Sequence, residues 1–125
     1  PMELVKYQYK QNGHYETTVT VKINGEQFEF TGVGNGRLDG ISNALQTGLK
    51  IEYKDLIYRQ QALEVGSSSQ ALSYIGITAP NGEKFWGCGI DTDIMNSSVK
   101  ALFSAINKMI SSLNIPLVEQ LNVVK

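Results

Sequence analysis

The residues of this 125-residue chain that could do chemistry lie in one glycine-rich stretch, Gly32-Val33-Gly34-Asn35-Gly36-Arg37-Leu38-Asp39-Gly40. Its three glycines at alternate positions predict a backbone that takes positive φ or approaches another group closely, and Asn35 is the residue that best tolerates the left-handed region. Because an alternating apolar run precedes the stretch and a helical pattern follows it, we predict a tight strand-to-helix turn. The free amides at such a helix start attract an anion, such as a phosphate or a carboxylate.

Hydrophobic periodicity predicts the elements that must position this turn. Before it, strands are predicted over 3–10, 17–23 and 28–32, and after it a helix extends to about Lys50. The pattern then restarts, with strands predicted over 57–65, 71–78 and 85–90 and a longer helix opening at 91–93. Asp91 or Thr92 is expected to cap this second helix, and Pro116 ends or bends what precedes it.

The two halves of the chain are copies of each other. Asn24-Gly25-Glu26 recurs 57 positions later as Asn81-Gly82-Glu83, and seven of the 22 positions from 24 to 45 are identical at this shift. Average usage would give roughly one or two identities. We therefore predict an α+β fold of two pseudo-symmetric strand–strand–strand–helix units packed together, with a domain over 1–114, repeats over 1–57 and 58–114, and an apolar tail over 115–125.

The copies differ at the turn itself. The first reads Gly34-Asn35-Gly36-Arg37, whereas its counterpart reads Asp91-Thr92-Asp93-Ile94. Two carboxylates would repel an anion and serve the helix start instead. Had the fold alone required the glycines, both copies should have kept them, so we expect the first turn to bind a ligand.

The totals exclude several classes of function. The net charge is −1 and basic residues are scattered, which argues against nucleic-acid binding. No apolar run reaches the roughly 18 residues that span a membrane, and no leader suggests export. The single cysteine, Cys88, fits a reducing cytoplasm, and we expect it to serve as a small buried residue. The sequence holds no catalytic or metal-binding constellation, and no cofactor is expected in this domain.

Three stretches resemble the C-terminal regulatory domains of the 2-isopropylmalate synthase and citramalate synthase family. The first is the glycine stretch with Asn43-Ala44-Leu45. The second is Tyr58 to Ala62, then Gly66 and Ser69-Gln70-Ala71. The third is Phe85-Trp86-Gly87-Cys88-Gly89-Ile90-Asp91-Thr92-Asp93-Ile94 with the helix that follows. The resemblance covers about Val19 to Ile110. The sequence departs from the family at Arg37, where proline is usual, and at Gly40, where alanine is usual.

The resemblance implies a domain that binds a branched-chain amino acid, pairs in a homodimer and inhibits a metal-dependent catalytic barrel of the same polypeptide. The family's effector contacts correspond to Gly34, Asn35, Gly36, Leu38, Asp39, Tyr58, Ala62 and Ser69. The effector would be leucine, its carboxylate on the amides of Gly34–Gly36 and its aliphatic chain against Leu38, Tyr58 and Ala62. Two alternatives stay open. One is an isoleucine-sensing domain of a citramalate synthase, and the other is a purely structural dimerisation module, which the departures at Arg37 and Gly40 leave open.

Overall fold

The computed structural model describes residues 2–65 and 68–117, which form two compact units. One unit holds the first 52 residues and the described residues from Leu113 onward, and the other spans Tyr53–Ser112. The elements in chain order are β1 (Met2–Asn12), β2 (His14–Ile23), β3 (Glu26–Gly34), α1 (Arg37–Leu49), β4 (Lys54–Val65), β5 (Ser68–Thr78), β6 (Lys84–Asp91) and α2 (Ile94–Leu113). Three strands and a helix, used twice, confirm the predicted α+β class.

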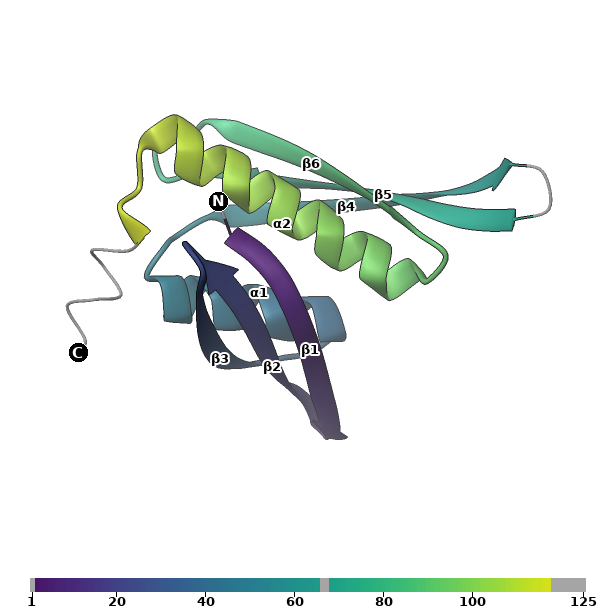
Figure 1. The fold of residues 1–125 in the computed structure, drawn as a ribbon, viewed down its shortest axis with the longest axis horizontal. Helices are drawn as coiled ribbons and strands as arrows, with labels where there is room; N and C mark the ends of the chain where they lie inside the picture. The colour runs from purple at the N-terminus through teal and green to yellow at the C-terminus, as the bar shows by residue number, and fades with distance from the viewer. Residues whose placement is uncertain (1, 66–67, 118–125) are drawn as a thin grey trace. The chain divides into compact units, whose positions relative to one another are not determined.

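In the first unit, β1, β2 and β3 form an antiparallel sheet in that order, and α1 crosses one of its faces (Figure 1). The alternation in β2 places Val19, Val21 and Ile23 on the buried face. Against them α1 buries one apolar stripe, formed by Ile41, Ala44, Leu45 and Leu49. The core of this unit therefore lies between the sheet and α1.

The second unit repeats this plan, with β4, β5 and β6 in an antiparallel sheet and α2 along one face (Figure 1). Ile75 and Ile77 of β5 are fully buried. On β6, Gly87 and Gly89 let the helix come close, because a Cβ on either residue would collide with the backbone of α2. Of the helices in the described residues, none is long and apolar enough to cross a membrane.

The repeat extends to individual hydrogen bonds. In the first unit the side-chain amide of Asn43 donates to the carbonyl of Val33 at 2.8 Å, and in the second the ammonium of Lys100 donates to the carbonyl of Ile90 at 3.2 Å. Each helix residue and each carbonyl are related by the same shift of 57. Two different side chains thus tie the helix to the same point of the last strand.

A single shift does not relate all the elements, however. Val19 pairs with Phe30, and Ile75 pairs with Gly87, so the shift is 57 for the last strand but 56 for the middle one. The cause is the hairpin loop. Ile23 and Glu26 close a two-residue loop, whereas the bond from the amide of Ala79 to the carbonyl of Glu83 closes one of three residues.

Cys88 is exposed, so the expectation of a buried cysteine is wrong. Residues alternate between the two faces of a strand, and on β6 the glycines at 87 and 89 occupy the face toward α2. Trp86, Cys88 and Ile90, which alternate with these glycines, therefore face away from the helix. Among them Trp86 is 41% exposed and its ring covers Gly76 of the neighbouring strand.

Candidate functional site

The predicted strand-to-helix turn is present, but its glycines serve close approach rather than positive φ. Positive φ occurs elsewhere among the described residues, and neither Asn35 nor any glycine from Gly32 to Gly36 adopts it. A Cβ on Gly32 would collide with the backbone nitrogen of Ala44, and one on Gly34 would lie 2.6 Å from that of Gly40. Gly32 and Gly34 are therefore needed to let α1 pack on β3.

Gly36 is different, because nothing in the fold requires a glycine there. It is the N-cap of α1, with an extended backbone (φ −134°, ψ 171°) that any residue adopts. A Cβ on it would meet one atom of the described structure within 4 Å, the Oδ2 of Asp39 at 3.9 Å. No side chain caps the helix at this position. The first turn of α1 consequently presents its backbone amides to open space.

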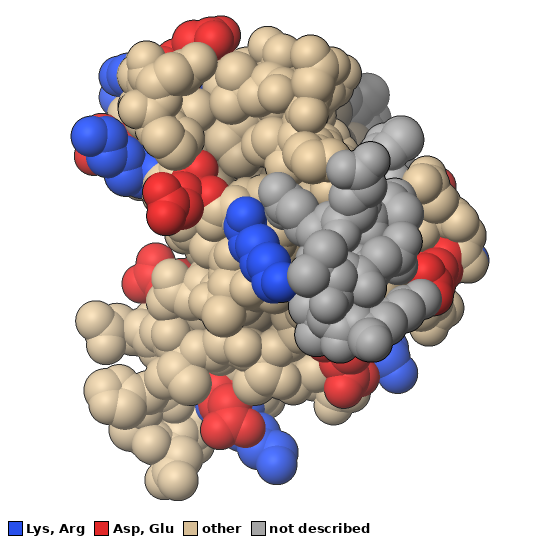
Figure 2. Space-filling view, turned by 90° about the vertical axis from the view of Figure 1, so that its left-hand side faces the viewer, with Lys and Arg blue, Asp and Glu red and all other residues tan. Residues whose placement is uncertain are grey.

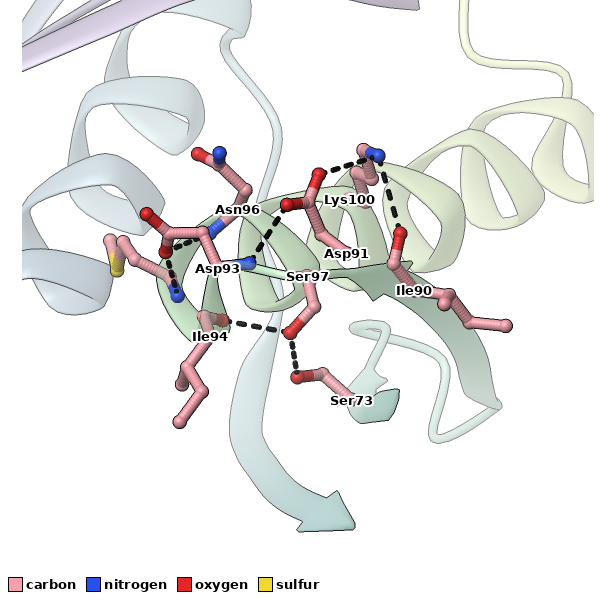
Figure 3. A network of polar contacts seen from close by, with 9 residues as sticks. Ser73, Ile90, Asp91, Asp93, Ile94, Asn96, Ser97 and Lys100 are labelled. Carbon is pink, nitrogen blue, oxygen red and sulfur yellow. Dashed lines mark hydrogen bonds and ion pairs between the residues drawn. The ribbon is translucent and has the colours of Figure 1, made fainter. Parts of the chain in front are cut away.

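The start of α2 has the opposite arrangement (Figure 3). The Oδ1 of Asp93 accepts the backbone amides of Met95 at 2.7 Å and Asn96 at 3.2 Å. The amide of Asp93 itself donates to the Oδ1 of Asp91 at 2.9 Å. These bonds confirm that the carboxylates of the second copy serve the helix start, although the cap is Asp93 rather than Asp91 or Thr92.

Asp91 has a second partner that fixes its charge. Its Oδ2 lies 2.9 Å from the Nζ of Lys100, which also donates to the carbonyl of Ile90 (Figure 3). The backbone bond from Asp93, followed by the bond from Lys100, holds the pKa of Asp91 below its usual value. The start of α2 is thus occupied by the protein's own anions.

Arg37, the first residue of α1, is held by a residue that sequence reasoning missed. Its Nη1 donates to the hydroxyl of Tyr9 on β1 at 3.0 Å, and its guanidinium lies 5.3 Å from the centre of the Tyr9 ring. This hydrogen bond raises the pKa of Arg37. Tyr9 in turn packs edge-on against Tyr15. Arg37 and Tyr9 are 28 positions apart, so no local motif could have shown their contact.

The eight predicted site residues fall into two groups, one in each unit. Those from Gly34 to Asp39 come together at the start of α1, where Asn35 and Asp39 are exposed and Leu38 is half-buried. Tyr58, Ala62 and Ser69 belong to the paired strands β4 and β5 and are exposed. The hydroxyl of Tyr58 accepts a hydrogen bond from Ser98 of α2 at 3.0 Å.

On the face that Figure 2 shows, acidic and basic residues are interspersed among uncharged ones. Within residues 2–65 and 68–117, no three histidine, cysteine, aspartate or glutamate side chains gather in a group that could hold a metal ion. In the described part of the chain, the uncapped start of α1 is a feature that suits an anionic group.

Comparison with known proteins identifies the family. Residues 1–110 match the family described as the LeuA allosteric (dimerisation) domain. The chain belongs to this family. It is 54% identical over 110 residues to a 2-isopropylmalate synthase of Desulfitobacterium hafniense, which covers 88% of the chain and 20% of that protein.

Other relatives of the LeuA domain carry the same name. The 2-isopropylmalate synthase of Helicobacter hepaticus is 46% identical over 84 residues, covering 67% of the chain and 15% of that protein. The enzyme of that name in Saccharomyces cerevisiae is 33% identical over 118 residues, covering 89% of the chain and 19% of the protein. The chain spans between 15% and 20% of the length of these relatives.

Proposed function

We propose that this LeuA domain is the allosteric regulatory domain of a 2-isopropylmalate synthase. It binds leucine for feedback inhibition, forms a homodimer, and acts on a catalytic barrel of the same polypeptide in the cytoplasm. The observation that carries the proposal is the contrast between two equivalent helix starts. That of α2 is capped by Asp93, whereas that of α1 has no side-chain cap at Gly36. The relatives share the name 2-isopropylmalate synthase, which supports the assignment of the domain to that enzyme.

The second unit provides a template for the ligand's carboxylate. Asp93 accepts the amides of Met95 and Asn96, whose counterparts at a shift of 57 are Leu38 and Asp39. A free carboxylate placed likewise before α1 would take up these two amides, which the helix cannot satisfy itself. The amide of Gly36, counterpart of the one that Asp91 accepts, would serve a third bond. The sequence had suggested the amides of Gly34–Gly36 instead.

The rest of an amino acid also finds complementary groups among the proposed contacts. The carboxylate of Asp39 is exposed in the first turn of α1 and suits an ammonium group. Leu38 is half-buried and offers an apolar surface for a branched side chain. Allostery requires that this ligand favour one of two arrangements of the protein.

The relatives described above favour leucine over the alternative of isoleucine, because each carries the name 2-isopropylmalate synthase and none that of a citramalate synthase. Calorimetric titration of the chain with leucine, isoleucine and valine tests the proposal. We expect saturable binding that is tightest for leucine. Tightest binding of isoleucine would point to the citramalate reading, and no binding of any of the three to a structural dimerisation module.

A matched pair of variants locates the site. Gly36→Val should fold, because the backbone there is extended and the space around it is open, but its branched side chain would stand in front of the helix amides and abolish leucine binding. Asp93→Val changes the equivalent position of the other unit and should leave binding intact. Equal binding by the parent and a folded Gly36→Val variant would rule out this helix start.

A further inference from the structure

The sheet of the second unit has an outer face, the one that points away from α2. On β6, Gly87 and Gly89 lie against the helix, so Trp86, Cys88 and Ile90 occupy the outer face. The strand registers place six further residues beside them: Ile57, Arg59 and Gln61 of β4, and Leu72, Tyr74 and Gly76 of β5. These nine residues are the outer face of the second sheet.

Most of this outer face is apolar and accessible. Trp86 and Tyr74 are each 41% exposed, Ile90 is 46% exposed, and Cys88 between them is exposed as well. Its one charged residue is Arg59, which lies in the same row as Tyr74 and Cys88. A contiguous apolar patch on a protein surface is typical of an interaction site, whereas scattered apolar residues are not.

The equivalent face of the first sheet is polar, although both sheets have the same plan. Because Gly32 lies against α1, the residues of β3 on that sheet's outer face are Glu29, Thr31 and Val33. Their neighbours in the register include Lys6, Lys10 and Glu16. At a shift of 57, glutamate and threonine thus stand where the second sheet has Trp86 and Cys88. The fold therefore does not require apolar residues on this face.

The two outer faces differ as the core of a protein–protein interface differs from an ordinary surface. Tryptophan, tyrosine and arginine are enriched in such cores, while lysine and glutamate are depleted. The outer face of the second sheet has the first three residue types and neither of the last two. Arginine suits this setting because its planar guanidinium stacks on aromatic rings and is weakly hydrated.

We propose that two molecules of this chain pair through the outer faces of their second sheets. The inference rests on the homodimer of the proposed function and assigns it a surface. The matching family is described as a dimerisation domain, which favours a second molecule of the chain as the partner. A two-fold interface presents the same patch from both subunits. This patch can pack against itself because it holds no lysine, aspartate or glutamate that pairing would bury.

A matched pair of lysine substitutions tests the surface. Ile90→Lys and Val33→Lys alter positions related by the shift of 57, which are 46% and 52% exposed. Light scattering or sedimentation should give the mass of a dimer for the parent and for Val33→Lys. For Ile90→Lys the dissociation constant of the dimer should rise about thirtyfold, the usual minimum for a residue that dominates an interface.

The thiol of Cys88 provides a second measurement on the parent chain. Its reaction with a maleimide should slow as the protein concentration rises through the dissociation constant of the dimer, because pairing covers it. The control is the double variant Cys88→Ser/Thr31→Cys, which moves the thiol to the equivalent position of the first sheet. In that variant the labelling rate should not depend on protein concentration.

The outcomes separate this inference from the function on which it rests. If the parent is a dimer and a folded Ile90→Lys variant pairs as tightly, the assigned surface is wrong while the homodimer stands. A Cys88 labelling rate that is the same at all concentrations, in a chain that pairs, also overturns the surface. If the parent is a monomer at every concentration, the homodimer falls together with its surface. A leucine titration of the same preparations tests the effector part of the proposed function independently.

Discussion

The carboxylate of Asp93 accepts the backbone amide of Met95 at 2.7 Å, so the second unit carries at its own helix start the kind of group that the first is proposed to bind. The equivalent helices of the two units thus differ in whether a side chain of the protein accepts their first amides. One is complete without a ligand, whereas the other begins at Gly36 without any side-chain cap. This difference yields predictions on stability and on binding that can be measured separately.

Removing the cap from α2 should cost stability and leave binding unchanged. In Asp93→Ala the amides of Met95 and Asn96 lose their acceptor, and loss of such a cap lowers the free energy of unfolding by about 1 kcal/mol. Urea unfolding and a leucine titration of the same preparation check both parts. An Asp93→Ala variant that lost leucine binding while still folded would show that the site extends to α2.

The Asp91–Lys100 pair should make stability depend on pH. The backbone amide of Asp93, followed by Lys100, lowers the pKa of Asp91 below its ordinary value of 3.8. These interactions therefore stabilise the fold above that pH and lose their contribution as the pH falls through the folded pKa. An NMR titration of the Asp91 carboxyl should give a midpoint below 3.8. In Lys100→Ala the midpoint should rise, and an unchanged midpoint would exclude the ion pair as a cause.

The first unit contains a buried, unsatisfied hydroxyl group, that of Thr17, close to Gly40. The hydroxyl of Thr17 is buried and has no hydrogen-bond partner among the described residues, and a Cβ on Gly40 would lie 2.5 Å from it. In the second unit the corresponding residues, Ser73 and Ser97, are hydrogen-bonded at 2.7 Å. Thr17→Val should therefore raise the free energy of unfolding by about 1 kcal/mol, since it removes an unsatisfied polar group.

Substitutions at Thr17 and Gly40 should have non-additive effects on the free energy of unfolding. Gly40→Ala alone crowds Thr17 and should destabilise the chain, although alanine is the better helix former. In a chain that already carries Thr17→Ala, where this space is free, Gly40→Ala should raise the free energy of unfolding. Denaturant unfolding of the single and double variants measures the coupling, and a Gly40→Ala variant as stable as the parent would mean that Thr17 has room to move.

The sequence predicted the order of the elements because alternation in β2 and the helical stripe of α2 are strong local patterns. It also predicted the contrast between the helix starts, since aspartate and glycine have opposite effects at such a position. It could not tell why Gly32 and Gly34 are glycines, because positive φ and close approach call for the same residue. The Arg37–Tyr9 contact escaped prediction because it joins separate elements.

The three-residue loop between Ala79 and Glu83 also escaped prediction. A constant shift of 57 aligned the residues after the hairpins and hid the offset of the strands before them. The exposure of Cys88 was missed for a related reason. Only the position of α2 shows which face of β6 its glycines occupy, and that position is set by packing rather than by local sequence.

The most direct test of the central claim is a leucine titration of Gly36→Asp beside the parent chain. The extended backbone at Gly36 suits an aspartate cap, which would give α1 the start that Asp93 gives α2. The account predicts a chain that is more stable by about 0.5 kcal/mol and no longer binds leucine, because its own carboxylate occupies the amides of Leu38 and Asp39. A Gly36→Asp chain with raised stability that bound leucine as tightly as the parent would contradict it.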